Sequence, residues 1–394
     1  MIIEIRKAGF VNKGAELMLY AALQQLRRKY PDALFTMSPI YSGLRGSERF
    51  DAYYKQAELA LLPKAWLYHY GFHLSDIANL VPKKIRQLYG LVIDKEVDVV
   101  IDAAGFSYSD QWGEGSSLEL EKSTRRWRRR GCAVILLPQA LGPFTSKYSK
   151  KSIAAVINNV DLVFAREEIS YNYLIEVVGE RANISLSPDF TNLVQGIIPE
   201  SFDSRSHRFC IVPNHRMIDK TNQSESDAYI PFLIKCANYL VKKKCSPFLL
   251  VHEGEKDLML AQKISKAVNG VCPVVIEKNP LQVKGILGTC EGTIGSRYHG
   301  LVSALNQGVP SLATGWSHKY EMLFKDYDFQ EGMIDVLGGD DLFREKVDLI
   351  VNPYSRMNIR SKLIERTKVL KKQSEEMWEK VFEIIDLRYK IKKI

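Results

Sequence analysis

The chain has 394 residues, of which 46% are hydrophobic and 26% are charged, with 25 glycines and 15 prolines. The length predicts two domains, and the composition excludes disordered, collagenous and repeat proteins. No uncharged apolar run approaches the ~18 residues of a membrane span, and the first residues lack the apolar stretch of a signal peptide, so we expect a cytoplasmic protein. The net charge is +9, and residues 356–394 contribute +6 of it, from 12 Lys and Arg against 6 Asp and Glu.

Short apolar runs alternate with longer segments of helical periodicity in the first half of the chain. This alternation predicts an α/β protein with parallel sheets and crossover helices. Strands are expected at residues 2–5, 97–101, 133–137, 162–165 and 184–186. Helices are expected near residues 15–29, 84–95, 117–130, 148–159 and 168–178.

A second series of the same kind follows. Strands are expected at 209–212, 248–251, 274–276, 292–294 and 311–313, and helices near 227–243, 255–268, 280–288 and 298–307. The polar stretch 195–204 separates the two series, so we expect two doubly wound Rossmann-like domains, at 1–197 and 205–345. The tail, 346–394, should form an amphipathic helical segment. In such domains ligands bind at the carboxyl ends of the strands.

The segment 291–300 carries the strongest local signal, because a strand there ends in Gly-Ser and a helix begins. The free N–H groups of a helix start favour anions, and Arg297 adds a cation, which indicates a phosphate or carboxylate site. His299 lies in the same turn and could give a proton to a ligand held by the arginine. The alternative is that Arg297 forms a surface ion pair and His299 is a polar spacer.

The loop 8–16 follows the first expected strand and leads into a helix. In a doubly wound domain this loop faces the ligand cleft, where Asn12, Lys13 and Glu16 would supply an amide, a cation and a carboxylate. Equally, Asn12 could cap the helix while Gly14 eases the turn.

Other polar residues also follow expected strands. The loops 102–110 and 138–144, together with Arg166 and Asp189, should lie at one edge of the first sheet, and His252 holds the equivalent place in the second. Their alternative roles are those of helix caps and salt-bridge partners.

Three further features are given structural interpretations. The arginine-rich run 125–130 lies at the end of an expected helix, where cations oppose the negative end of the dipole, so we expect no nucleic-acid partner. His69 and His73 have a metal-compatible spacing but no third ligand, and we expect ordinary packing. The six cysteines show no zinc-ligand spacing, so we expect reduced thiols and no metal.

Taken in order, these motifs resemble the polysaccharide pyruvyl transferase family. The similarity extends over residues 2 to about 325. The matching pieces are Asn12-Lys13-Gly14-Ala15-Glu16, the loop 102–110, Pro138-Gln139-Ala140-Leu141-Gly142-Pro143-Phe144, Ala165-Arg166-Glu167, Ser187-Pro188-Asp189, and Gly295-Ser296-Arg297-Tyr298-His299-Gly300 with Gly308-Val309-Pro310 and His318-Lys319 downstream.

The resemblance implies a two-domain, glycosyltransferase-B-like fold with the acceptor side in the first domain and the donor side in the second. It implies transfer of the enolpyruvyl carbons of phosphoenolpyruvate, a co-substrate, onto two hydroxyls of a sugar as a cyclic ketal, with no cofactor. The acceptor would be a glycan or a lipid-linked oligosaccharide of a cell-envelope polysaccharide or exopolysaccharide. Phosphoenolpyruvate carries a phosphate and a carboxylate, which independently calls for two cationic contacts.

Roles follow from the resemblance and from the chemistry together. His299 would protonate the methylene carbon of the donor, and Asp189, Glu16 and Asp102 remain open as the base for the sugar hydroxyl. The expected donor-binding residues are Arg297, Arg166, Ser296 and Lys319. The expected acceptor-binding residues are Asn12, Lys13, Asp102, Gln139 and His252.

Two positions depart from the common family pattern. Ala15 stands where many relatives have the Asp of a Gly-Asp pair, and Ala103-Ala104-Gly105 stands where a run of glycines is usual. The resemblance therefore does not define the acceptor sugar. The alternatives are a nucleotide-sugar-dependent glycosyltransferase on the same scaffold and a non-catalytic glycan-binding protein.

The basic tail has two interpretations. Its charged face could meet anionic headgroups, giving peripheral contact with the inner face of the membrane. Alternatively, it could pack back against the N-terminal domain as a structural helix.

Overall fold

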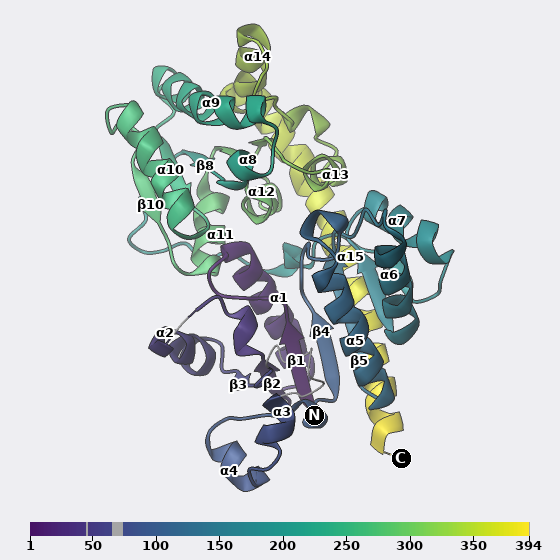
Figure 1. Cartoon of the computed structure of the whole chain (residues 1–394). Helices are drawn as coiled ribbons and strands as arrows, with labels where there is room; N and C mark the ends of the chain where they lie inside the picture. The colour runs from purple at the N-terminus through teal and green to yellow at the C-terminus, as the bar shows by residue number, and fades with distance from the viewer. Residues whose placement is uncertain (45, 65–73, 394) are drawn as a thin grey trace. The chain divides into compact units, whose positions relative to one another are not determined.

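The computed structural model describes residues 1–44, 46–64 and 74–393 (Figure 1). His69 and His73 lie outside these residues. The chain forms a seven-stranded sheet in the order β3-β2-β1-β4-β5-β6-β7 and a five-stranded sheet in the order β10-β9-β8-β11-β12. The strand pairs in both sheets are parallel. The expected α/β class is confirmed.

The chain divides into two compact units. Unit 1 comprises residues 1–11, 18–190 and 374–394, and unit 2 comprises residues 12–17 and 191–373. This division differs from the expected one in two respects. Residues 12–17 belong with the second sheet, and the tail forms no separate part, since its residues are shared between the units.

The first sheet and its helices form unit 1. Its strands are β1 (Ile2–Arg6), β2 (Leu34–Met37), β3 (Ala60–Leu61), β4 (Val99–Asp102), β5 (Ala133–Gln139), β6 (Leu162–Ala165) and β7 (Ile184–Leu186). Its helices are most of α1 (Lys13–Lys29), then α2 (Gly46–Phe50), α3 (Leu74–Ala78), α4 (Lys83–Leu88), α5 (Gly115–Arg129), α6 (Lys147–Asn159) and α7 (Glu168–Val178). Helices α5 and α6 pack side by side (Figure 1).

The second sheet and its helices form unit 2. Its strands are β8 (Phe209–Val212), β9 (Pro247–Val251), β10 (Val274–Ile276), β11 (Gly292–Gly295) and β12 (Ser311–Ala313). Its helices are α8 (Arg216–Asp219), α9 (Gln223–Lys242), α10 (Gly254–Ala267), α11 (Pro280–Thr289), α12 (Tyr298–Leu305), α13 (Lys319–Asp326), α14 (Asp340–Val351) and the first half of α15 (Pro353–Lys393).

The sheet of unit 2 is buried on both faces, as a parallel sheet covered by crossover helices should be. Phe209 and Ile211 of β8 belong to one apolar cluster, with Tyr229 and Leu233 of α9. The alternate residues, Cys210 and Val212, belong to a second cluster. Alternate side chains of β8 therefore point to opposite faces of the sheet, and the strand contributes to a core layer on each face.

Each sheet has one point where the strand order reverses. In unit 1 it lies between β1 and β4, where Arg6 is in register with Asp102. In unit 2 it lies between β8 and β11, where Val212 is in register with Gly295. Crevices outside the carboxyl ends of strands at such points are the usual ligand sites of doubly wound sheets.

The structure corrects one expected helix and adds two strands. The helix expected at 84–95 is wrong, because α4 ends at Leu88 and Gly90 adopts a left-handed φ of 61° that terminates it. Strands β2 and β3 were not expected. β3 has only two residues, too few to show a pattern, and β2 has four, of which Leu34 is exposed.

The C-terminal amphipathic helix is confirmed as the single 41-residue helix α15. Ile359, Leu363 and Leu370 are buried in the core of unit 2. Met377, Trp378, Val381 and Ile385 are buried farther along the helix, in its unit 1 part.

Several basic residues of the tail are paired. Arg356 binds Glu291 at 2.7 Å in unit 2. In unit 1, Arg388 binds Asp161, and Lys392 binds Asp98 at 2.8 Å. Among the described residues, no helix combines the length and apolar character needed to cross a bilayer.

All six cysteines are buried free thiols. Burial raises the pKa of Cys272 to about 12 and that of Cys132 to about 11.

Replacing Trp378 with Ala should lower the free energy of unfolding by about 3–5 kcal/mol, the usual range for a buried tryptophan. Only 1% of Trp378 is exposed, and its ring meets Phe190 edge-on at 6.4 Å and stacks on Phe382 at 5.6 Å. Leu387→Ala is the matched control, since Leu387 lies on the same helix and is 54% exposed. Thermal unfolding of both variants tests this, and equal losses would show that the helix is not packed through Trp378.

Candidate functional site

The turn between β11 and α12 is held by hydrogen bonds to Ser296. The Ser296 hydroxyl lies 2.9 Å from the hydroxyl of Tyr229 and 2.7 Å from that of Thr314. The Tyr320 hydroxyl donates to the Ser296 carbonyl at 2.8 Å. The side chain that we expected to bind the donor therefore helps to fix the turn, and a ligand would share its hydroxyl with these protein groups.

Arg297 follows directly and is buried between two carboxylates. Its Nε and Nη2 atoms donate to Asp257 at 2.8 and 2.6 Å, and its Nη1 atom binds Glu253. Burial lowers the pKa of Arg297 to about 10, so the guanidinium remains charged at neutral pH. Arg297 is thus not the surface ion-pair residue of the alternative interpretation.

Asp257 is a functional candidate that the sequence analysis missed, and Glu253, which adjoins the expected site residue His252, was given no role there. Asp257 is fully buried in α10, and it also accepts the backbone N–H of His215 at 3.0 Å. Glu253 precedes this helix. A spacing of four at a helix start places two side chains on one face, so the sequence carried a signal for this pair.

His299 lies against the first loop of the chain. A Cβ atom on Gly14 would fall 2.4 Å from Nδ1 of His299, a distance that real Cβ contacts do not show, so only glycine fits here. Asn12 also forms an antiparallel bridge with Glu253. Unit 2 therefore brings together the first loop, expected on the acceptor side, and the turn at 295–300, expected on the donor side.

Within this loop, Asn12 caps a helix. Its Oδ1 atom accepts the N–H groups of Gly14 and Ala15 at 2.8 and 3.2 Å, as the capping interpretation required. Lys13 Nζ donates to Glu16 Oε2 at 2.5 Å. Burial raises the pKa of Glu16 to about 7 against the opposing effect of Lys13. A carboxyl group with this pKa can exchange protons at neutral pH.

His252 is a buried neutral imidazole beside this cluster. Burial holds its pKa well below the usual value, and the positive charge of Arg297 adds to the shift. The side chain is 4% exposed, and within the described part of the chain its Nδ1 atom has no hydrogen-bond partner. Its Cδ2 atom is 3.5 Å from where a Cβ of Gly300 would stand. A ligand hydroxyl could use this nitrogen.

Lys319 begins α13 and lies among three aromatic rings. Its ammonium is 4.5 Å from the ring centroid of Trp316, 5.4 Å from that of Tyr320 and 5.5 Å from that of Tyr298. Tyr298 in turn meets the His299 ring edge-on at 5.3 Å. These contacts place Lys319 near the same turn as His299.

The remaining expected site residues lie in unit 1. Arg166 and Asp189 form a buried ion pair at 3.3 Å, and the backbone N–H of Arg166 donates to the Gln139 carbonyl at 3.0 Å. The Gln139 amide donates to Asp102 at 3.4 Å. Four of the expected residues thus form one buried chain of contacts at the carboxyl ends of β4, β5 and β6.

Asp102 is the most enclosed of these residues. Arg6 approaches it at 3.0 Å, and the Tyr108 hydroxyl donates to it at 2.7 Å. Burial raises the pKa of Asp102, while the cation of Arg6 opposes the rise. Arg6 was not singled out by the sequence analysis, because it ends an apolar strand, whereas Tyr108 lies in the candidate loop 102–110 but was given no role of its own.

Four of the five arginines of the run 125–130 bind carboxylates of unit 1. Arg126 and Arg130 both bind Asp94, Arg128 binds Asp161 at 3.1 Å, and Arg125 binds Glu121 at 2.7 Å. Within residues 1–44, 46–64 and 74–393, no group of three His, Cys, Asp or Glu side chains could hold a metal ion.

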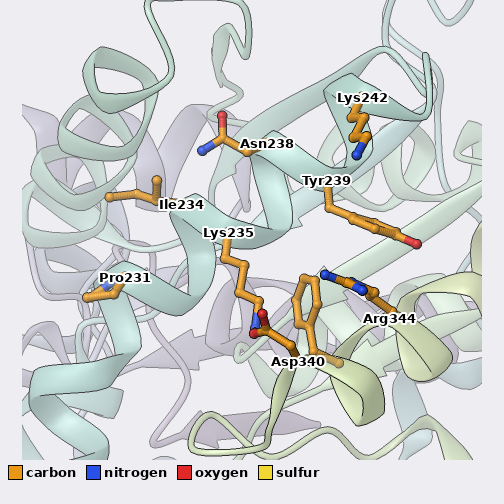
Figure 2. Close-up of a pocket in the computed structure, with 9 residues that line it drawn as sticks. Pro231, Ile234, Lys235, Asn238, Tyr239, Lys242, Asp340 and Arg344 are labelled. Carbon is orange, nitrogen blue, oxygen red and sulfur yellow. The ribbon is translucent and has the colours of Figure 1, made fainter.

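A separate hollow of about 600 Å³ lies between α9 and α14 (Figure 2). Lys235 lies on its wall, paired with Asp340 at 2.5 Å and placed 4.2 Å from the ring centroid of Phe343. The hollow is lined by none of the expected site residues, so we assign it no part in the site.

Comparison with known proteins gives one family and one fold. The family model for polysaccharide pyruvyl transferase matches residues 12–318. Among solved structures, HepE from Anabaena in complex with UDP and glucose has a TM-score of 0.55 at 12% identity, over 98% of this chain and 99% of that chain. UDP-GlcNAc 2-epimerase from Neisseria meningitidis bound to UDP-GlcNAc has a TM-score of 0.58 at 10% identity, over 97% and 100%. These likenesses confirm the expected glycosyltransferase-B-like fold class.

Replacing Asp257 with Ala should cost about 3–5 kcal/mol of stability, because a buried guanidinium loses its bidentate partner. Asp219→Ala is the matched control, since Asp219 binds Arg216 at 2.8 Å in a partly exposed pair of the same unit. Such pairs contribute ~1 kcal/mol or less. Urea unfolding of the two variants gives the comparison, and an Asp257 variant as stable as the control would contradict the prediction.

Proposed function

The chain belongs to the polysaccharide pyruvyl transferase family, and we propose that it transfers a pyruvyl group from phosphoenolpyruvate to two hydroxyls of a sugar, releasing phosphate and forming a cyclic ketal. The acceptor is a residue of a cell-envelope polysaccharide or exopolysaccharide, or of its lipid-linked precursor. The observation that carries the proposal is the family match over 12–318, which includes the whole cluster from Asn12 to the turn at 295–300.

His299 is the proposed acid. A proton on the methylene carbon makes the neighbouring carbon electrophilic, and a sugar hydroxyl attacks it and loses its proton. Departure of phosphate then leaves an oxocarbenium ion, which the second hydroxyl closes to the ketal as its own proton is lost. A histidine suits the first step because its ordinary pKa lies near neutrality.

The proposed anion contact in unit 2 is Arg297. The fork between Arg297 and Asp257 is fully buried, whereas the carboxylate of Glu253 is 27% exposed. A phosphate group would therefore take the place of Glu253 on Nη1 while Asp257 keeps the guanidinium in position. The expected role of Arg166 in donor binding stays a prediction, and its side chain in unit 1 is paired with Asp189.

Glu16 is the proposed base. Its pKa of about 7 leaves a substantial fraction ionised at neutral pH. Asp189 is paired with Arg166, and Asp102 accepts from Tyr108 and Gln139 inside the core of unit 1. Among the three residues that the sequence left open, Glu16 therefore matches best the requirement for a pKa near the working pH.

The proposed reaction is tested by incubating the purified protein with phosphoenolpyruvate and a panel of lipid-linked and aryl glycosides. We expect release of inorganic phosphate and a product heavier than the acceptor by pyruvate less one water. Parallel reactions receive UDP-glucose or UDP-GlcNAc as donor. A product heavier by a whole sugar residue, with no phosphate release from phosphoenolpyruvate, would overturn the proposal in favour of glycosyl transfer.

His299→Ala should lower kcat by roughly 10²–10⁴-fold, the usual contribution of a general acid. Phosphoenolpyruvate binding, measured by calorimetry, should change little, because the imidazole acts mainly in the transition state. Near-normal turnover in this variant would remove His299 from the acid role.

The pH dependence of kcat tests the base. Glu16 must be ionised to accept a proton, so the rate of the wild-type protein should fall as the pH drops below about 7. Glu16→Gln should lower kcat and abolish this acidic limb. Lys13→Met should move the limb to higher pH, because Lys13 lowers the pKa of Glu16. A limb that is unchanged in both variants would exclude Glu16 as the base.

A further inference from the structure

Six large apolar side chains are exposed within residues 77–89 of unit 1. Leu80 and Leu88 are 82% and 83% exposed. The other four are Ile77, Val81, Ile85 and Tyr89, and we call the six the α3–α4 patch. Such a concentration of exposed apolar side chains marks an interaction surface in a folded protein.

The charged residues within 77–89 are basic. They are Lys83, Lys84 and Arg86, and Asp76 precedes them in α3. Both lysines are exposed, and Lys83 is near enough to Glu96 to lower the pKa of that carboxyl. Arg86 is buried and bound to Glu96. The surface therefore offers two exposed cations among apolar side chains.

The fold holds this segment in place by contacts beneath it. Arg86 binds both oxygens of Glu96, at 2.6 and 2.9 Å, and its Nε atom donates to the Val81 carbonyl at 3.1 Å. The Tyr54 hydroxyl donates to the Tyr89 carbonyl at 3.0 Å. These polar contacts anchor the backbone of the segment, and its six large apolar side chains are exposed. Helices α3 and α4 can be located in Figure 1.

We propose that the α3–α4 patch docks unit 1 onto the surface of an anionic lipid bilayer. Apolar side chains can enter the region between headgroups and acyl chains, while neighbouring lysines contact anionic headgroups. A protein partner would use the same leucines, so binding to protein-free lipid vesicles is the observation that distinguishes a bilayer from a protein. The inference does not rest on the proposed function.

This assignment differs from the earlier interpretation of the basic tail. Arg388 and Lys392 of α15 are bound to Asp161 and Asp98, so part of that charge is already neutralised within the protein. Lys83 and Lys84 are both exposed. The tail keeps other exposed basic residues, such as Lys362 and Lys372, so variants of both segments are needed to separate their contributions.

Sedimentation with vesicles tests the proposal. The full chain is mixed with vesicles of phosphatidylcholine alone or of phosphatidylcholine with phosphatidylglycerol. We expect binding to the anionic vesicles that weakens as ionic strength rises from ~0.1 M to ~1 M, since the Debye length falls from ~10 Å to ~3 Å. Absence of binding to anionic vesicles at low salt would overturn the proposal.

Two double variants separate the apolar and charged contributions. Leu80→Ser with Leu88→Ser should lower the partition coefficient at least ~10-fold on anionic vesicles, because burial of even one leucine changes an equilibrium by about this factor or more. Lys83→Glu with Lys84→Glu should lower it by at least ~5-fold per lysine. Thermal unfolding should be unchanged in both, since the altered side chains are exposed.

The controls alter exposed apolar and basic residues on α15. Tyr354→Ser with Met357→Ser changes two exposed apolar residues, 73% and 60% exposed. Lys362→Glu with Lys372→Glu reverses two exposed charges of the tail. Loss of vesicle binding in these controls equal to that in the patch variants would overturn the assignment. A concentration-dependent dimer that Leu80→Ser with Leu88→Ser converts to a monomer would instead make the patch an interface between copies of this chain.

Discussion

The ion pair between Arg297 and Asp257 is the interaction on which the candidate site of unit 2 depends. A guanidinium fork on a fully buried carboxylate is geometrically specific, and loss of either partner leaves an uncompensated charge. Asp257 also receives the backbone N–H of His215, so one carboxylate ties together segments that follow β8, β9 and β11. The turn that carries His299 is thereby fixed at the point where the strand order reverses.

Unit 1 contains a similar arrangement at its own reversal point. Arg6 and Asp102, at the ends of β1 and β4, are paired in the core, and Asp102 is further bound to Tyr108 and Gln139. Such buried charges require complete hydrogen bonding, which restricts the conformations that the surrounding loops can adopt. At the reversal point of each sheet, the buried charged side chains are therefore already paired with a side chain of opposite charge.

The sequence predicted the fold class, ten of the twelve strands in the described residues and the amphipathic tail, because apolar runs and their periodicity are local signals. It missed the short strands β2 and β3, and it extended α4 past Gly90, whose backbone conformation the pattern did not reveal. For the site, it placed Arg297 and His299 correctly at a helix start. It could not show that Arg297 is enclosed by two carboxylates, because Asp257 lies 40 residues away and meets it only through the tertiary fold. The contact of Gly14 with His299 was hidden for the same reason.

The burial of every cysteine has a practical consequence for measuring this protein in solution. A thiol reacts through its thiolate, and burial both shields these sulfurs and raises the pKa of Cys272 and Cys132. A cysteine introduced at an exposed position such as Leu88 or Tyr354 should then be the fast-reacting thiol of the folded chain, with all six native cysteines left in place. A fluorophore or spin label attached there would report on that surface alone, whereas modification of the native thiols would report on unfolding.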